Sequence, residues 1–334
     1  MRPPMRPGRR PLTISVRRGP LLESSHRVHA VITDAAGRIA GSWGDAARAT
    51  VLRSAAKPFQ ALPLVADGAV DHFGFSGEEI ALCCGSHNSE EAHLSVARSM
   101  LAKAGVAESL LVCGPHPPLR RERERELAAA GTPLTPIMSN CSGKHAGMLA
   151  LAAFHSWPLE GYENPAHPVQ LRMRLELARW ARCDPRAIPT AVDGCGVPTF
   201  AIPLADLAVA MARLAVAAEE GGAPGRVVGA MASHPFMVAG TDRLCTRLVQ
   251  AEEGRVIAKT GAEGVYAAAD RTRGLGVAVK VEDGAWRAAP PALLAVLASA
   301  GILSQAAARA LAEHVEPPLT NTLGNVVGHL AADP

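Results

Sequence analysis

The sequence contains no long uninterrupted apolar run, and this absence limits where the protein can act. Of the 334 residues 48% are hydrophobic, yet no stretch reaches the roughly 18 consecutive apolar residues that a membrane-spanning helix needs. Residues 1–11 form a basic tail interrupted by prolines, and this tail lacks the apolar core of a signal peptide. The sequence therefore predicts a disordered tail on a cytoplasmic protein that does not enter a membrane.

A strong excess of charge of one sign and a disulfide framework are also missing. The net charge is +3, and arginines of the tail account for part of it. Because nucleic-acid and membrane partners are bound by strongly basic surfaces, the near-neutral remainder indicates neither partner. The seven cysteines are odd in number and widely spread, without a secretory context, which argues against disulfides.

The chain also has no internal repeat and no low-complexity linker, so residues 12–334 are predicted to form a single catalytic unit. Alternating apolar residues predict strands near the N-terminus, and Gly-separated apolar runs predict an antiparallel meander later. A helical pattern fills the middle, and a soft tail is expected after a last helix. The predicted strands cover residues 12–17, 26–33, 38–42, 255–259, 263–269 and 276–281, and the last helix covers 291–299.

This order predicts an α+β fold: one antiparallel sheet built from both chain ends, with flanking helices and an inserted helical lobe. The sheet lobe is expected over about 12–55 and 226–334, and the helical lobe over about 56–225. Ser76 and Glu79 form a capping-box pattern at one helix start. The cleft between sheet and helical lobe is the natural place for an active site.

Two further helices of the middle block differ in their expected surroundings. Residues 118–130 carry arginines and glutamates in alternation, which is typical of an exposed helix rather than of a basic binding patch. Residues 143–154 are almost wholly apolar, as expected of a helix buried on all sides. Arg243 is interpreted as a residue at a helix end.

Three short motifs carry the first chemical signal: Ser54-x-x-Lys57, Ser86-His87-Asn88 and Lys259-Thr260-Gly261. Alone, the first fits a helix cap followed by a solvated lysine. Penicillin-binding proteins and class A β-lactamases carry S-x-x-K, S-D-N and K-T-G in the same order, and this chain departs only at the middle position of the second motif. The order favours one active site.

A serine hydroxyl attacks a carbonyl only after a base has taken its proton, and a lysine is a base only when it is neutral. Burial and a second nearby cation favour the neutral lysine. Two pairs are expected, Ser54 with Lys57 and Ser86 with Lys259, and the spacing leaves open which hydroxyl attacks. Pro58 fits only the first turn of a helix, so Ser54 should lie at or just before a helix start, where N–H groups can bind an oxyanion.

Two glycine-bearing loops place cysteines beside other metal-binding side chains, namely Cys141-Ser-Gly-Lys-His145 and Asp193-Gly-Cys-Gly196. From donor chemistry alone, Cys141, Cys195 and His145 are candidate zinc ligands, with a fourth position left for water or substrate. The alternative is two buried thiols beside a helix-capping loop, because no C-x-x-C or H-x-x-x-H spacing is present. Arg53 is suited either to a substrate carboxylate or to a structural salt bridge.

With these motifs the chain resembles the rhizobial-type L-asparaginase family, also called class 3 or thermolabile asparaginases. The matching stretches run across nearly the whole chain after the tail. They are Arg53-Ser-Ala-Ala-Lys-Pro-Phe-Gln60, Cys84-Gly-Ser-His-Asn88, Cys141-Ser-Gly-Lys-His-Ala-Gly147, Asp193-Gly-Cys-Gly-Val-Pro198 and Lys259-Thr-Gly-Ala-Glu-Gly264.

The resemblance implies a fold like that of penicillin-binding proteins, serine β-lactamases and glutaminases. It also implies hydrolysis of L-asparagine to L-aspartate and ammonia by a homodimer. Its implied site residues comprise two Ser-Lys pairs, three zinc ligands and three residues near the zinc or the substrate. They are Ser54 with Lys57, Ser86 with Lys259, the ligands Cys141, Lys144 and Cys195, and the neighbours Arg53, His145 and Asp193.

The resemblance thus puts Lys144 where donor chemistry suggested His145. A lysine ligand must lose its proton, which Zn²⁺ can drive as it does for thiols. Two rivals stay open at this point. A penicillin-binding or β-lactamase-like acylase would share the three motifs, and a non-catalytic amino-acid-binding protein would use the same cleft. The motifs leave the preference between asparagine and glutamine open as well.

Overall fold

Strands from both ends of the chain build the main sheet. The computed structural model describes residues 10–333. Residues 1–9 of the tail expected over 1–11 therefore lie outside the described residues. The strands are β1 (Leu12–Arg18), β2 (Leu21–Asp34), β3 (Ile39–Trp43), β4 (Ala49–Val51), β5 (Thr190–Val192), β6 (Pro198–Pro203), β7 (Val256–Gly261), β8 (Val265–Asp270), β9 (Leu275–Val281), β10 (Pro318–Thr320) and β11 (Val326–Ala332). The main sheet has the order β10-β11-β1-β2-β9-β8-β7, with β3 paired to β2. The predicted α+β class with a sheet from both chain ends is confirmed.

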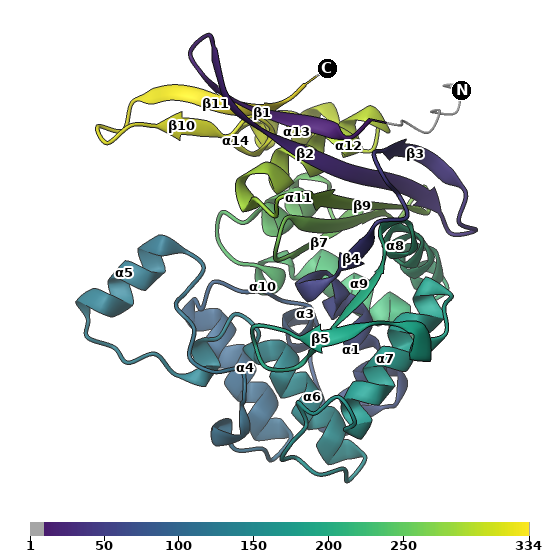
Figure 1. Ribbon diagram of the computed structural model, residues 1–334. Helices are drawn as coiled ribbons and strands as arrows, with labels where there is room; N and C mark the ends of the chain where they lie inside the picture. The colour runs from purple at the N-terminus through teal and green to yellow at the C-terminus, as the bar shows by residue number, and fades with distance from the viewer. Residues whose placement is uncertain (1–9, 334) are drawn as a thin grey trace. The chain divides into compact units, whose positions relative to one another are not determined.

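Most of the helices lie in the middle of the chain, between the N-terminal and the C-terminal strands (Figure 1). They are η1 (Arg53–Ala56), α1 (Lys57–Ala66), α2 (Ala69–Phe73), α3 (Gly77–Cys83), α4 (Glu91–Lys103), η2 (Glu108–Leu110), α5 (Arg121–Ala129), η3 (Pro136–Met138), α6 (Ser142–Phe154), α7 (Pro168–Ala181), η4 (Pro185–Ala187), α8 (Leu204–Glu219), α9 (Gly222–Ser233), α10 (Pro235–Val238), α11 (Leu244–Ala251), η5 (Trp286–Ala288), α12 (Ala289–Ser299), α13 (Gln305–Ala310) and α14 (Ala312–Val315). None of the helices within residues 10–333 combines the length and the apolar character needed to cross a membrane.

The chain divides into two compact units. The first comprises residues 10–55, 202–216 and 247–333 and contains the main sheet, so we call it the sheet unit. The second comprises residues 56–201 and 217–246 and contains most of the helices, so we call it the helical unit.

In the sheet unit every pairing of the main sheet is antiparallel. Each residue of β7 and β8 is buried, so both faces of these strands are covered. Helix α12 packs on β8 and β9. Helix α8 lies so close to β9 that a Cβ atom on Gly276 would come within 1.9 Å of the Ala208 carbonyl oxygen. Only a glycine fits at this crossing.

The prediction of a soft C-terminal tail is wrong. Helices α13 and α14 and strands β10 and β11 occupy this region, and β11 pairs with β1 through Ile14 opposite Ala332. Strand β11 contains a glycine, a histidine and two alanines, so its local pattern carries little contrast between two faces. Its partner lies at the other end of the chain, where no local pattern can indicate it.

In the helical unit α6 is the central helix. All its residues from Ser142 to Ala152 are buried, and α1, α3, α4 and α7 pack around it. The predicted buried helix is confirmed, as is the capping box, in which the Ser76 hydroxyl accepts from the Glu79 N–H at 3.3 Å. Strand β5 lies in a segment that the sequence indicates as strand-like, residues 188–192, whereas its partner β6 was not predicted.

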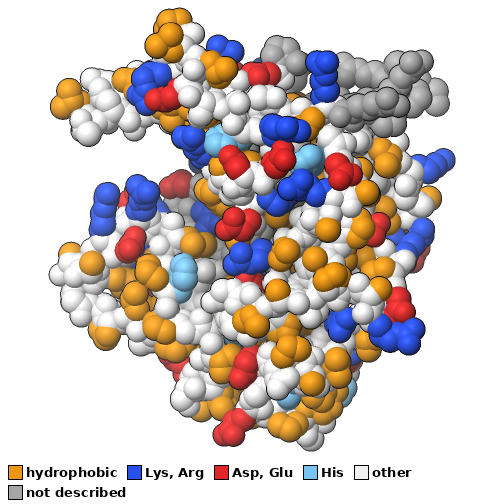
Figure 2. Space-filling view, in the orientation of Figure 1, with side chains coloured by type: hydrophobic (Ala, Val, Ile, Leu, Met, Phe, Trp, Pro, Cys, Tyr) orange, Lys and Arg blue, Asp and Glu red, His pale blue; other side chains and the backbone are white. Residues whose placement is uncertain are grey.

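The arginine- and glutamate-rich helix is exposed, as expected. Leu127 is the buried residue of α5, and side chains of both charge signs gather on the part of the surface where this helix projects (Figure 2). Because the two signs alternate, α5 presents a solvated charged surface rather than a basic patch.

Candidate active site

The S-x-x-K motif spans the change from η1 to α1. Helix α1 begins at Lys57 with Pro58 in its first turn, so Ser54 lies just before the α-helix, as predicted. Arg53 has a φ of +49°, in the left-handed region that residues other than glycine rarely adopt. Such strained residues concentrate at functional sites.

Within the sheet unit the K-T-G motif meets the segment that carries Ser54. A Cβ atom on Gly261 would lie 2.6 Å from the Leu52 carbonyl oxygen and 3.4 Å from the Ala55 nitrogen. The glycine therefore lets the end of β7 pass directly beside the backbone around Ser54. Lys259, two residues earlier on the same strand, is fully buried.

Within the helical unit the lysine of the first motif reaches the serine of the second. Lys57 is fully buried, and its Nζ donates to the Ser86 hydroxyl at 3.0 Å and to the Gly85 carbonyl. A third contact joins Lys57 Nζ to Cys141 Sγ at 3.3 Å. The Lys57–Ser86 contact was not predicted. The predicted pairs Ser54–Lys57 and Ser86–Lys259 each join a residue of the sheet unit to one of the helical unit, and they stay predictions.

His87 ties the Ser86 loop to the start of α6. Its Nδ1 accepts from the Ser89 N–H at 3.1 Å, so the proton lies on Nε2, which donates to the Ser142 hydroxyl at 2.9 Å. Burial, followed by the nearby His93 and Lys57, lowers the pKa of His87 well below its usual value. The His87 imidazole thus connects the Ser86 loop to the start of α6.

The two cysteine loops also meet in the helical unit. Cys141 and Cys195 share a hydrogen bond, and Lys144 Nζ lies 3.0 Å from Cys195 Sγ. The hydrogen bond from Cys195 lowers the pKa of Cys141, helped by the charges of Lys57 and Lys144. The same hydrogen bond and burial raise the pKa of Cys195. The sulfurs of Cys141 and Cys195 and the amines of Lys57 and Lys144 therefore form a buried cluster.

Two further predicted residues border this cluster. Asp193 accepts the Gly194 N–H at 2.7 Å. Burial lowers the pKa of Lys144, but the nearby Cys141, Cys195 and Asp193 outweigh this effect, so the pKa is raised. His145 Nδ1 lies 2.6 Å from the Tyr162 hydroxyl, while its buried Nε2 has no hydrogen-bond partner. Burial, then the charges of Lys144 and Lys57, lowers the pKa of His145.

The donor set fits zinc only if Lys144 is a ligand. Over residues 10–333 no three side chains of the His, Cys, Asp and Glu types come together in a way that could hold a metal ion. Cys141 and Cys195 with His145 therefore do not form a site of the usual kind. Two sulfurs and an amine do converge in Cys141, Cys195 and Lys144, and sulfur and nitrogen donors suit Zn²⁺.

Two residues at the site carry no motif that would reveal them. Arg243 donates to the Ser86 carbonyl at 3.5 Å, and Tyr162 accepts from the Val112 N–H at 3.2 Å while contacting His145. Arg243 does precede helix α11, as expected, but the contact with the Ser86 loop arises from tertiary packing. No local spacing could have indicated it.

Comparison with known families agrees with these motifs. The family model described as L-asparaginase II matches residues 14–332. The chain belongs to the L-asparaginase II family. This membership confirms the family expected from the five motif stretches.

Similarity to individual proteins is weak. No curated protein matches the chain. The solved structure of Mglu in its native form at 4.3 M NaCl is 16% identical, with a TM-score of 0.43, 83% of this chain covered and 62% of that one. A β-lactamase from Mycobacterium bovis is 14% identical, with a TM-score of 0.35 and coverages of 81% and 94%. The chain thus spans less than two thirds of Mglu.

Proposed function

We propose that this member of the L-asparaginase II family hydrolyses the side-chain amide of L-asparagine to L-aspartate and ammonia. One observation carries the proposal: a fully buried lysine, Lys57, lies 3.0 Å from the hydroxyl of Ser86 and three residues after Ser54. A buried lysine beside serine hydroxyls is the arrangement that nucleophilic amide cleavage requires.

In the proposed reaction Lys57 takes the proton of the Ser54 hydroxyl, and Ser54 Oγ forms a bond to the amide carbon. Backbone N–H groups at the start of α1 stabilise the oxyanion. The C–N bond then breaks, and the nitrogen leaves as ammonia after receiving a proton through Ser86 and Lys259. Water attacks the acyl-enzyme, releasing L-aspartate and returning the proton to Ser54.

The contacts of the helical unit support a proton relay between the two serines. Lys57 is hydrogen-bonded to Ser86, so a proton taken from Ser54 has a direct onward acceptor. Arg53 is assigned to the substrate carboxylate because a guanidinium binds a carboxylate with two parallel hydrogen bonds. His145 and Asp193 complete the assigned substrate surroundings.

We further propose that Cys141, Lys144 and Cys195 bind zinc. Bound there, the ion would hold or position the substrate rather than supply hydroxide, because the site already has a serine nucleophile. The protein's own part is to keep the two sulfurs deprotonated and Lys144 neutral, which requires loss of the protons that the cluster holds without metal.

Metal content tests the zinc site. Protein prepared with zinc is expected to hold about one ion per chain. Cys141→Ser, Cys195→Ser and Lys144→Met should each weaken zinc binding by more than roughly 10- to 100-fold, the loss typical when a residue that hydrogen-bonds to a ligand is replaced. Elemental analysis and competition with a chelator measure both. Cys245→Ser, a buried thiol elsewhere, serves as the control. Unchanged zinc content in all three ligand variants would exclude the site.

Turnover tests the function. The purified protein is expected to release ammonia from L-asparagine, and parallel assays with L-glutamine measure the preference between the two amides. Covalent labelling by a fluorescent penicillin without ammonia release would instead favour the acylase. Tight asparagine binding with no ammonia would favour a binding protein. Either result would contradict the proposal.

A further inference from the structure

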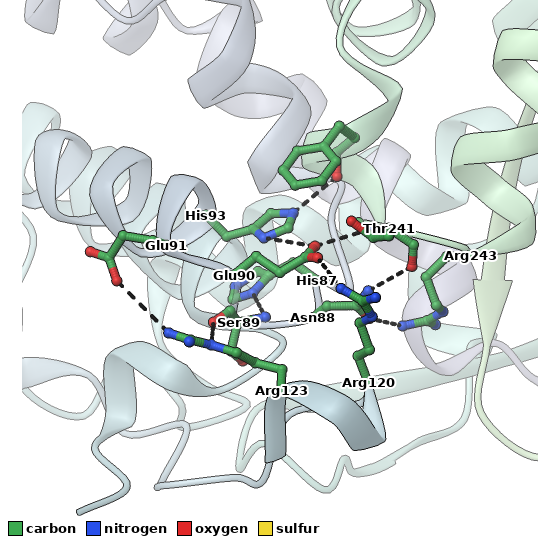
Figure 3. Close-up of polar contacts among 12 residues, drawn as sticks. His87, Asn88, Ser89, Glu90, Glu91, His93, Arg120, Arg123, Thr241 and Arg243 are labelled. Carbon is green, nitrogen blue, oxygen red and sulfur yellow. Dashed lines mark hydrogen bonds and ion pairs between the residues drawn. The ribbon is translucent and has the colours of Figure 1, made fainter. Parts of the chain in front are cut away.

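The loop that carries Ser86 is hydrogen-bonded to the loop that follows α10 (Figure 3). The Ser86 N–H donates to the Val238 carbonyl at 2.9 Å. Arg243 Nη1 donates to Asn88 Oδ1 at 2.9 Å and to the Ser86 carbonyl at 3.5 Å. The Asn88 side chain in turn donates to the Thr241 carbonyl at 3.0 Å. Both backbone groups of Ser86 and both ends of the Asn88 amide are thus engaged.

A second layer of contacts holds the two loops together. One carboxylate oxygen of Glu90 accepts the Thr241 N–H at 3.1 Å, and the other accepts from Arg120 at 3.3 Å (Figure 3). Gly240 has a φ of +110°, and a Cβ atom there would lie 2.6 Å from Glu90 Oε2 and 2.7 Å from Asn88 Nδ2. The loops therefore pass at a distance that leaves no room for a side chain.

This arrangement holds the backbone of Ser86. Asn88 is fully buried, so its amide must keep both a donor and an acceptor partner. Arg243 Nη1 supplies the donor to Asn88, and the same nitrogen reaches the Ser86 carbonyl. On the opposite side, Lys57 holds the Ser86 hydroxyl and the Gly85 carbonyl. Ser86 is thus held by the side chains of Lys57 and Arg243, which contact different atoms.

We propose that Arg243 is a positioning residue for Ser86. Together with Asn88 it holds the backbone of Ser86 so that the hydroxyl stays within hydrogen-bond reach of Lys57. The inference rests on the Ser-Lys amidase proposed above. Arg243 contacts Ser86 through its carbonyl and not through its hydroxyl, so its loss misplaces the hydroxyl without removing a reacting group. A displacement of about 1 Å in a catalytic group costs roughly 10²-fold in rate.

Kinetics of matched variants test the proposal. Arg243→Ala is expected to lower kcat for asparagine by about 10- to 100-fold while KM changes by less than about threefold, because substrate binding is untouched. Free guanidinium at millimolar concentration should restore part of the lost kcat, and Arg243→Lys should restore less than full activity because an ammonium lacks the planar fork. Arg226→Ala is the control: this exposed arginine on α9 pairs with Asp71 at 2.8 Å, and its loss should change neither constant.

A double-mutant cycle separates positioning from general damage. Asn88→Ala should lower kcat by a similar factor, and the double variant should be no slower than the slower single variant, because both act through one contact. Wild-type kcat in Arg243→Ala, or losses that multiply in the double variant, would overturn the proposal. If the wild type releases no ammonia, the proposed function fails instead. Crystal structures then decide: an unchanged Lys57–Ser86 distance in Arg243→Ala overturns the positioning role, and a lengthened one supports it.

Discussion

Replacing Lys57 by methionine is expected to lower kcat for ammonia release from L-asparagine by about 10³-fold or more. Methionine keeps the unbranched stem but cannot accept a proton, so the proposed base for Ser54 and the contact to Ser86 are lost together. Steady-state kinetics at saturating asparagine measure the change. Ser54→Ala should lose a comparable factor, because base and nucleophile act as one unit.

The same substitution has a stability cost that must be separated from the catalytic one. Without Lys57 Nζ, the buried Gly85 carbonyl and Ser86 hydroxyl lose a donor, at about 1–3 kcal/mol for a buried polar group left without a partner. Denaturant unfolding of the variant measures this loss. Lys103→Met is the matched control, because it replaces another lysine of the helical unit by methionine; the Lys103 ammonium pairs with Glu79 at 2.7 Å. Near-normal turnover in Lys57→Met would remove Lys57 from the mechanism.

The pattern of apolar and capping residues predicted those strands and helix starts that depend on residues close together in the sequence. The strands near β1 to β3 and β7 to β9 were predicted from local apolar patterns, and β7 and β8 are apolar runs because both of their faces are covered. Ser76 with Glu79 closes its capping box within four residues. Strand β11 was missed because its stabilising contacts come from β1, at the far end of the chain. A strand with little contrast between its faces is formed by its partner and not by its own pattern.

The candidate site divides in the same way. The order of motifs selected the candidate serines, lysines and cysteines, but the spacing within S-x-x-K describes only the reach along one helix. The contact from Lys57 to Ser86 depends on packing that brings the α3–α4 loop to α1. Neighbouring residues on a helix point about 100° apart. The choice of Lys144 over His145 as a proposed zinc ligand came from the family resemblance and not from the spacing.

Arg243 illustrates the limit most clearly. It lies at a helix start, where an arginine has an ordinary interpretation, and the groups it binds are a backbone carbonyl and an amide more than 150 residues earlier. Neither partner leaves a mark in the sequence around Arg243. Residues that position a site through backbone atoms are visible only once the loops they join are placed.

Gly143→Ala is expected to destabilise the protein by about 3 kcal/mol, a large effect for one methyl group. Gly143 lies in the first turn of α6, where a Cβ atom would come 2.5 Å from Leu82 Cγ and 2.6 Å from the Leu82 carbonyl oxygen. The side chain can rotate away, but the backbone of α3 cannot. The gain of about 1 kcal/mol from replacing a helical glycine by alanine is too small to offset this clash.

A second glycine provides the matched control. Gly229 lies within α9 of the same unit, and a Cβ atom there would meet nothing within 4 Å. Gly229→Ala should therefore stabilise the protein by up to about 1 kcal/mol, and urea unfolding of the two variants compares them directly. If Gly143→Ala unfolds at the same urea concentration as Gly229→Ala, the close approach of α6 to α3 is wrong. If it unfolds earlier and also loses zinc, the glycine serves the site as well, because α6 carries Lys144 towards Cys195.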